Sequence, residues 1–129
     1  MRRCVIDAWA ILAWLFNERG ADTVERVLGT SALSAVNLAE VLYRCDEVGM
    51  ATGTLERDIE ALGVRVEPFG ASDAHLVEEV RRAGRRSAVR LSLADCCCLA
   101  TGIRLDLPVV GGDEAWRGLR LGIDVHPFR

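Results

Sequence analysis

The sequence contains no lysine and no glutamine, and it has only three prolines among 129 residues. The absence of lysine excludes every mechanism that depends on a lysine amine. Positive charge is also scarce, because 19 acidic residues stand against 16 basic ones and give a formal net charge of −3. This balance excludes a protein that holds nucleic acid by bulk positive charge. Half of the residues are apolar, which excludes a disordered chain and predicts one domain, residues 1–129, with a sizeable core.

Long hydrophobic segments and paired cysteine motifs are absent as well. The longest unbroken apolar run covers nine residues, 8–16, whereas a membrane-spanning helix needs roughly 20. The five cysteines, at positions 4, 45, 96, 97 and 98, form no C-x-x-C pair. Consecutive cysteines on a helix point about 100° apart and cannot converge on one ion. We therefore expect a soluble, cytoplasmic protein with buried, reduced thiols.

Short apolar runs alternate with longer segments of helical periodicity, which is typical of an α/β domain with a parallel sheet. Strands are predicted at residues 4–6, 64–66, 108–110 and 123–125, the last at a sheet edge. Helices are predicted at residues 8–16, 22–28, 34–49, 54–63, 72–84 and 92–102, with a short one starting at 113. Ser34, Ser72 and Ser92 are the expected caps of three helices, and an arginine-rich connection is expected after residue 84.

Four acidic residues fall where α/β folds form binding sites. Asp7 ends the first strand, and Asp113 follows the strand at 108–110 after a Gly-Gly turn. The carboxyl ends of parallel strands lie at one edge of the sheet, which is where ligands bind in such folds. Asp95 lies in the first turn of a predicted helix and Glu40 lies inside another. These four residues are the candidate site.

Each of these acids also has a purely structural explanation. The two strand-end acids can serve as helix N-caps, and Asp95 can form a capping box with Ser92. Glu40 can belong to a solvated helix face with Asn37 and pair with Arg44 four residues later. The coincidence of two acids at the ends of two strands of one sheet favours a functional site over these explanations.

Carboxylates that lie together predict a bound cation. Like charges a few ångströms apart raise one another's pKa, and a divalent cation removes the conflict. Oxygen ligands without histidine or cysteine indicate Mg²⁺ or Mn²⁺ rather than zinc. Because Mg²⁺ favours sites that substrate phosphates complete, the expected chemistry is attack of an activated water on a phosphodiester.

Four segments, in this order, resemble the PIN domain family, and specifically the VapC-type toxins of bacterial toxin–antitoxin pairs. They are Val5-Ile6-Asp7-Ala8, Ser34-Ala35-Val36-Asn37-Leu38-Ala39-Glu40-Val41, Leu91-Ser92-Leu93-Ala94-Asp95, and Pro108-Val109-Val110-Gly111-Gly112-Asp113-Glu114-Ala115-Trp116. The resemblance spans essentially the whole chain. It implies a three-layer α/β fold with a central, mostly parallel sheet of four to five short strands flanked by helices.

The same resemblance implies an activity, a cofactor and partners. It implies an Mg²⁺- or Mn²⁺-dependent endoribonuclease that forms homodimers and is silenced by a cognate antitoxin. Asp7, Glu40, Asp95 and Asp113 match the family's catalytic and metal-binding acids by motif position. On this hypothesis the three aspartates hold one or two ions, while Glu40 completes the shell of a second ion or orients the attacking water.

Two positions depart from the family's usual pattern. Many relatives carry serine or threonine two residues after the first acid, where this chain has Trp9, and threonine where it has Gly111. Both departures remove a hydroxyl that can orient a carboxylate or a bound water. They bear on rate and metal affinity more than on reaction class, because all four acids are present.

Residues 81–90 hold five arginines and no acid. A local positive patch is sufficient to contact nucleic-acid phosphates, so Arg85, Arg86 and Arg90 are candidate substrate-binding residues. The alternative is a solvated helix end whose arginines lie near the negative pole of the helix dipole.

Three other functions compete with a nuclease. A receiver-type signalling domain needs an acidic pair after its first strand and a late lysine, and this chain has a lone Asp7 and no lysine. A haloacid-dehalogenase-type phosphatase needs a second aspartate where Trp9 stands. A PIN-like module that binds RNA or a partner without turnover remains the main alternative, because Trp9 and Gly111 depart from the pattern.

Overall fold

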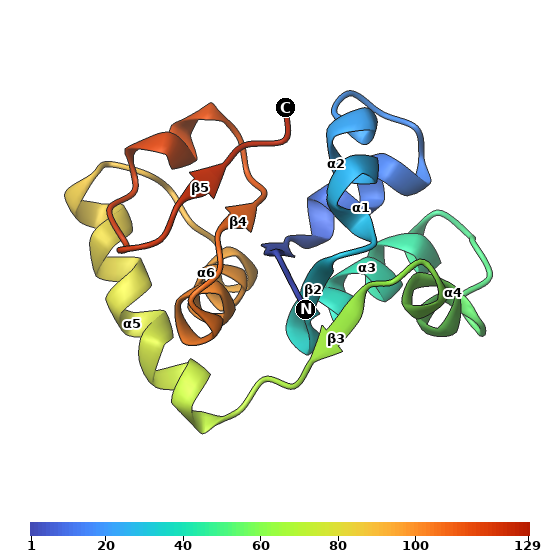
Figure 1. Ribbon diagram of the computed structural model, residues 1–129, viewed down its shortest axis with the longest axis horizontal. Helices are drawn as coiled ribbons and strands as arrows, with labels where there is room; N and C mark the ends of the chain where they lie inside the picture. The colour runs from blue at the N-terminus through green and yellow to red at the C-terminus, as the bar shows by residue number, and fades with distance from the viewer.

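A computed structural model describes all residues, 1–129, and its centre is a five-stranded sheet in which every pair of neighbours is parallel (Figure 1). The strand order is β3-β2-β1-β4-β5. The strands are β1 (Cys4–Ile6), β2 (Ser31–Ser34), β3 (Arg65–Glu67), β4 (Val109–Val110) and β5 (Val125–His126). The expected α/β class is confirmed, and the sheet is entirely rather than mostly parallel.

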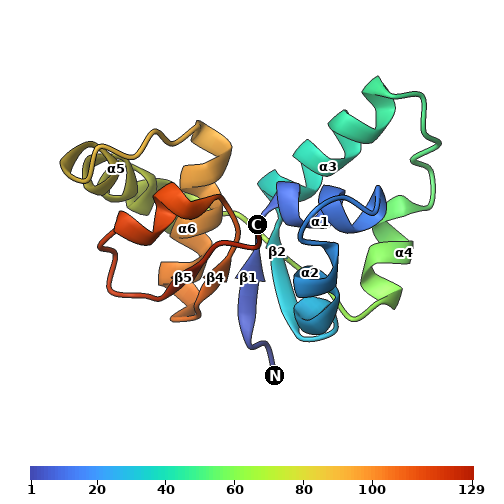
Figure 2. The same ribbon diagram turned by 90° about the horizontal axis from the view of Figure 1, so that it is seen from above.

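Helices cover both faces of this sheet and produce three layers (Figure 2). One core cluster joins one face to the first four helices, and a second joins the other face to the remaining helical elements. The first four are α1 (Ala8–Leu15), α2 (Ala21–Leu28), α3 (Ala35–Glu47) and α4 (Leu55–Ala61). The others are α5 (Ala71–Arg86), α6 (Leu93–Leu105) and the 3₁₀ helix η1 (Glu114–Gly118). None of these helices combines the length and apolarity that a bilayer crossing requires.

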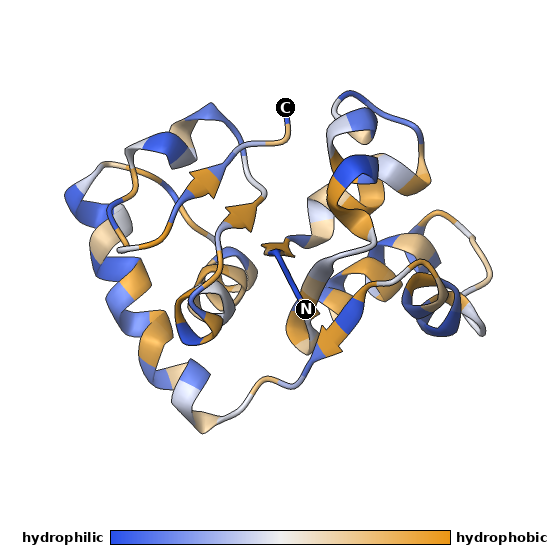
Figure 3. Cartoon of the chain, viewed as in Figure 1, coloured by the Kyte–Doolittle hydropathy of each residue, from blue (hydrophilic) through white to orange (hydrophobic).

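The central strands are apolar on both faces, and this explains why the sheet is parallel and covered. Ile6 packs into the first core cluster, whereas its neighbour Val5 packs into the second. Val110 and Val109 divide between the two clusters in the same way. Successive side chains of a strand point to opposite faces, so a strand buried on both sides is a continuous apolar run. Figure 3 shows this contrast between β1 and β4, which are orange, and the alternating colours of α5.

Strand β2 was not among the predicted strands. Its sequence, Ser-Ala-Leu-Ser, has serine at both ends and no β-branched residue, so it lacks the composition that marks a strand. The structure buries both serines because their hydroxyls find local partners. Ser31 Oγ donates to the Leu28 carbonyl at 2.8 Å, and Ser34 Oγ accepts from the Val36 amide at 3.2 Å and caps α3. The segment is a strand because it pairs with β1 on one side and with β3 on the other.

Helix α5 begins earlier and ends later than predicted. Its N-cap is Gly70 and not Ser72, because the Asp73 carboxylate accepts a 2.9 Å hydrogen bond from the Gly70 amide and fixes the start there. The helix continues through Gly84 to Arg86. Gly84 is buried inside the helix because Leu91 packs so closely that a Cβ there would lie 3.0 Å from its Cδ1. The first two residues of the predicted connection, Arg85 and Arg86, therefore belong to the helix, and the connection itself begins at Ser87.

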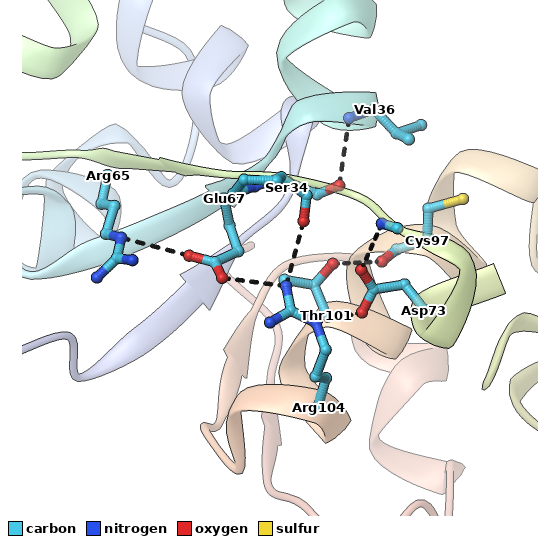
Figure 4. Close-up of polar contacts among 10 residues, drawn as sticks. Ser34, Val36, Arg65, Glu67, Asp73, Cys97, Thr101 and Arg104 are labelled. Carbon is cyan, nitrogen blue, oxygen red and sulfur yellow. Dashed lines mark hydrogen bonds and ion pairs between the residues drawn. The ribbon is translucent and has the colours of Figure 1, made fainter. Parts of the chain in front are cut away.

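A charged network ties the end of β3 to α5 and α6 (Figure 4). Arg104 on α6 forms ion pairs with Asp73 on α5 and with Glu67, which ends β3, the latter at 3.1 Å. Both acids are buried. Burial lowers the pKa of the Arg104 guanidinium, but the bonds to Asp73 and Glu67 raise it by more. The predicted arrangement of buried, unpaired cysteines is confirmed for all five thiols.

Candidate active site

The site lies where the chain reverses its progress across the sheet. From β1 the order runs through β2 to β3 on one side, and β4 and β5 lie on the other. Asp7 directly follows β1, and Gly111, Gly112 and Asp113 directly follow β4, its neighbour. Such a switch point between adjacent parallel strands leaves a crevice at their carboxyl ends, which is the usual binding site of open α/β sheets.

Asp7 is buried and is held by two backbone amides. The Ala10 amide donates to its Oδ1 at 2.8 Å, which caps α1, and the Gly112 amide donates to its Oδ2 at 2.9 Å. Burial raises the pKa of Asp7 to about 6, and the charges of Asp95 and Glu40 add to the rise, while the two amide bonds oppose it. Asp7 is therefore the N-cap of α1, as the structural explanation predicted. That role leaves unexplained why a cap is buried among other carboxylates.

The Gly-Gly turn after β4 is shaped around Asp7. A Cβ atom at Gly111 would lie 2.7 Å from Asp7 Cγ, a separation that real side chains do not tolerate. Gly112 has a φ of +69°, which favours glycine, and the Trp116 ring packs against it. The threonine that many relatives carry at position 111 has no room in this arrangement.

Asp95 and Asp113 are held in the same manner as Asp7, each at the start of a helix. Asp95 accepts a 2.8 Å hydrogen bond from the Ser92 amide, and Ser92 Oγ accepts from the Asp95 amide at 3.1 Å, so the predicted capping box is present. Asp113 accepts from the Ala115 amide at 2.9 Å and caps η1. These bonds fix the direction in which each carboxylate points.

One open pocket of about 280 Å³ brings the three aspartates together. Its lining comprises Asp7, Trp9, Arg90, Asp95, Gly112, Asp113, Trp116, Phe128 and Arg129. Of the predicted arginines, only Arg90 is at this pocket, and Arg85 and Arg86 are exposed in the last turn of α5. No sequence pattern predicted Phe128 and Arg129 as pocket residues. They reach the pocket because β5, which precedes them, pairs with β4.

Glu40 stands just outside this lining but interacts electrostatically with it. Burial raises the pKa of Glu40, the Asn37 amide opposes the rise, and the charge of Asp95 adds to it. No three acidic, histidine or cysteine side chains converge closely enough to form a ready metal-binding group. The structure therefore gathers the carboxylates around one pocket without placing them at coordination distance from a common point.

Asn37 is a residue of the site that sequence reasoning placed wrongly. It is buried rather than part of a solvated face, and its Nδ2 donates to the Ala94 carbonyl at 3.1 Å. It thereby ties the helix that carries Glu40 to the helix that carries Asp95. Its Oδ1 is buried and has no hydrogen-bond partner. The ion pair with Arg44, which the structural explanation of Glu40 allowed, is not formed, since Arg44 pairs with Glu47 at 3.0 Å.

The fold and this pocket define an α/β protein with an acidic site at the switch point of a parallel sheet. The PIN domain family model matches residues 4–120. The chain therefore belongs to the PIN domain family, as the resemblance implied. No curated protein matches the sequence.

Solved structures of toxin–antitoxin complexes share the fold. DNA-bound VapBC from Salmonella typhimurium matches with a TM-score of 0.69 at 14% identity, covering 100% of both chains. VapBC2 from Rickettsia felis, bound to a promoter fragment, matches with 0.69 at 14% identity, covering 95% of this chain and 96% of the other. A toxin–antitoxin complex from Klebsiella pneumoniae matches with 0.67 at 16% identity, covering 94% and 98%. At these identities the likeness concerns the fold.

Proposed function

We propose that this chain, over residues 1–129, is a metal-dependent endoribonuclease that acts as the toxin of a toxin–antitoxin pair. One observation carries the proposal: Asp7, Asp95 and Asp113 line a single pocket at the switch point of a PIN-family sheet, with Glu40 close enough to raise the pKa of Asp7. A structural role for each acid alone does not account for three aspartates from three separate segments that line one pocket.

The chemistry of the donor atoms around the pocket suits Mg²⁺ or Mn²⁺. The donors are all carboxylate oxygens, and the burial that raises the pKa of Asp7 is the penalty that a divalent cation removes. Asp7, Asp95 and Asp113 would hold the ion, with Glu40 as a further ligand or an outer-sphere partner. When bound, such an ion polarises the scissile phosphate and lowers the pKa of water.

The chain's own residues position and neutralise the reactants. Backbone amides aim Asp7, Asp95 and Asp113 before any substrate arrives, which avoids reorganisation during the reaction. Glu40, whose pKa is raised by burial, would accept the proton of the attacking water. Water oxygen bonds to phosphorus as the P–O3′ bond breaks, and the departing O3′ takes up a proton, which leaves a 5′-phosphate and a 3′-hydroxyl. Arg90 and Arg129 offer positive charge to the phosphate oxygens.

Cleavage of total RNA with Mg²⁺, with Mn²⁺ or with EDTA, followed by mapping of the new ends, tests the activity. Asp113→Asn keeps an oxygen that can cap η1 but removes the charge, so cleavage should fall on the order of a hundredfold or more. Glu114→Gln is the matched control, because Glu114 is adjacent, exposed and paired only with Arg117. Equal activity of wild type and Asp113→Asn, or full activity in EDTA, would refute the proposal. RNA that is bound but left intact would support the non-catalytic alternative.

Thermal unfolding with Mg²⁺ tests the cation site without an activity assay. At ten times its dissociation constant a cation that binds only the folded state stabilises it by about 1.4 kcal/mol, which raises the Tm of a chain of this size by about 5 °C. Asp113→Asn should lose most of this shift, and Glu114→Gln should retain it. An unchanged Tm for wild type over a wide range of Mg²⁺ would remove the metal from the proposal.

The arginines at the end of α5 are proposed to contact RNA outside the pocket. Arg85 and Arg86 are exposed, and Arg90 continues their positive charge to the pocket wall. Each phosphate contact adds roughly 0.7 to the slope of log affinity against log salt for a single strand. Replacing Arg85 and Arg86 with Ala should therefore flatten this slope, and an unchanged slope would exclude the pair from the interface.

An antitoxin and a second copy of the chain are the proposed protein partners, and the reducing cytoplasm is the proposed compartment. The structural neighbours were solved as toxin–antitoxin complexes, which supports the first partner. Co-expression with the product of a neighbouring small gene, followed by purification, should yield a complex that no longer cleaves RNA. Sedimentation of the free chain measures whether it is a dimer.

A further inference from the structure

Trp9 is an exposed aromatic residue at the edge of the candidate active site. It occupies the first turn of α1, two residues after Asp7, and 39% of its surface is exposed. Its side chain lines the same pocket as Asp7, Asp95 and Asp113. The rest of this turn is buried. Trp9 is thus the one exposed aromatic residue of the pocket, because the other two that line it, Trp116 and Phe128, are buried.

A second aromatic residue and an arginine extend this feature along α3. The Arg44 guanidinium carbon lies 5.4 Å from the centroid of the Trp9 ring and 5.8 Å from that of Tyr43. Both distances are within the range of cation–π attraction. Arg44 is partly buried, and its Nε has no hydrogen-bond partner. The guanidinium, which also pairs with Glu47, therefore packs against the indole from α3.

We propose that Trp9 is a stacking site for an unpaired nucleobase of single-stranded RNA next to the scissile phosphate. The inference rests on the proposed nuclease function and adds a subsite to it. Aromatic side chains supported by arginine are the recurring means of holding unstacked bases, because every base has a π face. Here the indole adjoins carboxylates suited to a metal ion and two arginines suited to a phosphate, so a base and its phosphate would be held side by side.

The charges around Trp9 favour a nucleotide over an apolar peptide. Arg90 and Arg129 line the pocket with Trp9, and three carboxylates form the rest of its polar wall. An apolar helix seated there would desolvate all of these charges without pairing them. Phe16 offers a comparison, because it lies seven residues after Trp9 at the C-cap of α1, is 43% exposed, and does not line the pocket.

Binding to three fluorescein-labelled ten-nucleotide strands tests the subsite: oligoadenylate, oligouridylate and an all-abasic strand. Asp113→Asn serves as the background, so that the strands stay intact. Adding Trp9→Ala should weaken oligoadenylate binding about tenfold and oligouridylate binding less, and should leave the abasic strand unchanged. Trp9→Phe should recover part of the loss, since a smaller ring still stacks. Phe16→Ala should bind all three strands as the background does.

Two results would overturn the inference. One is Trp9→Ala binding all strands as the background does, or losing affinity equally for the abasic strand, since neither depends on a base. The other is that Trp9→Ala and Phe16→Ala weaken the binding of a protein partner equally, while oligoadenylate binding stays unchanged. That result would assign this face of α1 to protein docking. In either case the proposed function stands if wild type cleaves RNA with a divalent cation. It falls separately if wild type neither binds nor cleaves.

Discussion

Arg104→Met tests whether the charged network, rather than apolar packing alone, holds α5 and α6 to the edge of the sheet. Methionine keeps a flexible apolar stem but has no charge. Asp73 and Glu67, whose side chains are 2% and 9% exposed, would then face each other without the cation between them. Arg65, 3.4 Å from Glu67, would remain, so Asp73 would be the acid left without an ion-pair partner.

The expected loss follows from how deeply this network is buried. Removing one partner of a fully buried ion pair costs about 3–5 kcal/mol. Because 28% of the Arg104 side chain is exposed and Arg65 still pairs with Glu67, the free energy of unfolding should fall by slightly less, about 2–3 kcal/mol. For a chain of this size the Tm should fall by about 10 °C.

Urea unfolding followed by far-UV circular dichroism measures this loss as a shift of the midpoint at constant slope. Arg82→Met is the matched control, because the Arg82–Glu78 pair on the same side of the sheet is exposed, at 48% and 73%, and is worth at most about 1 kcal/mol. Arg104→Met combined with Asp73→Asn should recover part of the loss, since the unpaired charge is gone and the new side-chain amide oxygen can still accept from the Gly70 amide. Equal midpoints for Arg104→Met and Arg82→Met would refute the reasoning.

Two further substitutions test the packing and capping around the site. Gly111→Ala places a Cβ 2.7 Å from Asp7 Cγ and should lower the free energy of unfolding in urea by about 1–3 kcal/mol. Gly118→Ala is the control and should cost far less, because a Cβ there meets only one atom, at 4.0 Å. Similar midpoints for the two variants would show that Asp7 moves freely. Ser92→Ala removes the hydroxyl cap of α6 and should cost about 1 kcal/mol, while Ser72→Ala, the cap that sequence reasoning expected on α5, should have no effect. A cost for Ser72→Ala would restore the predicted cap.

The same hydrogen bonds serve structure and site in this protein. Asp7 and Asp113 each cap a helix, and Asp95 completes the capping box of Ser92 at the start of α6. The amides that they satisfy also set their orientation at the pocket. A change to asparagine retains an acceptor for most of these bonds and removes the charge. Activity and stability can therefore be separated by substitution at Asp113, the most exposed of the three.

Several local elements were predictable because local physics decides them. The capping box of α6 needs only Ser92 and Asp95 three residues apart, and it is present. Strand β1 and strand β4 follow from short apolar runs with a turn or an acid after them. The predicted start of α5 was wrong, because the Asp73 carboxylate, and not the Ser72 hydroxyl, accepts a hydrogen bond at the helix start, from the Gly70 amide. Ser72 and Asp73 are adjacent and both can cap a helix, so only the tertiary structure distinguishes them.

The sequence by itself determined the class of fold, the order of the acidic motifs and the charge type of the site, because periodicity, caps and strand-end acids are written in neighbouring residues. Tertiary structure decided which of those residues meet. It buried Asn37 between two helices, assigned Arg44 to Trp9 rather than to Glu40, and brought Arg129 to the pocket. These placements depend on strand order and helix packing, which join residues far apart in the chain, and no local pattern encodes such distances.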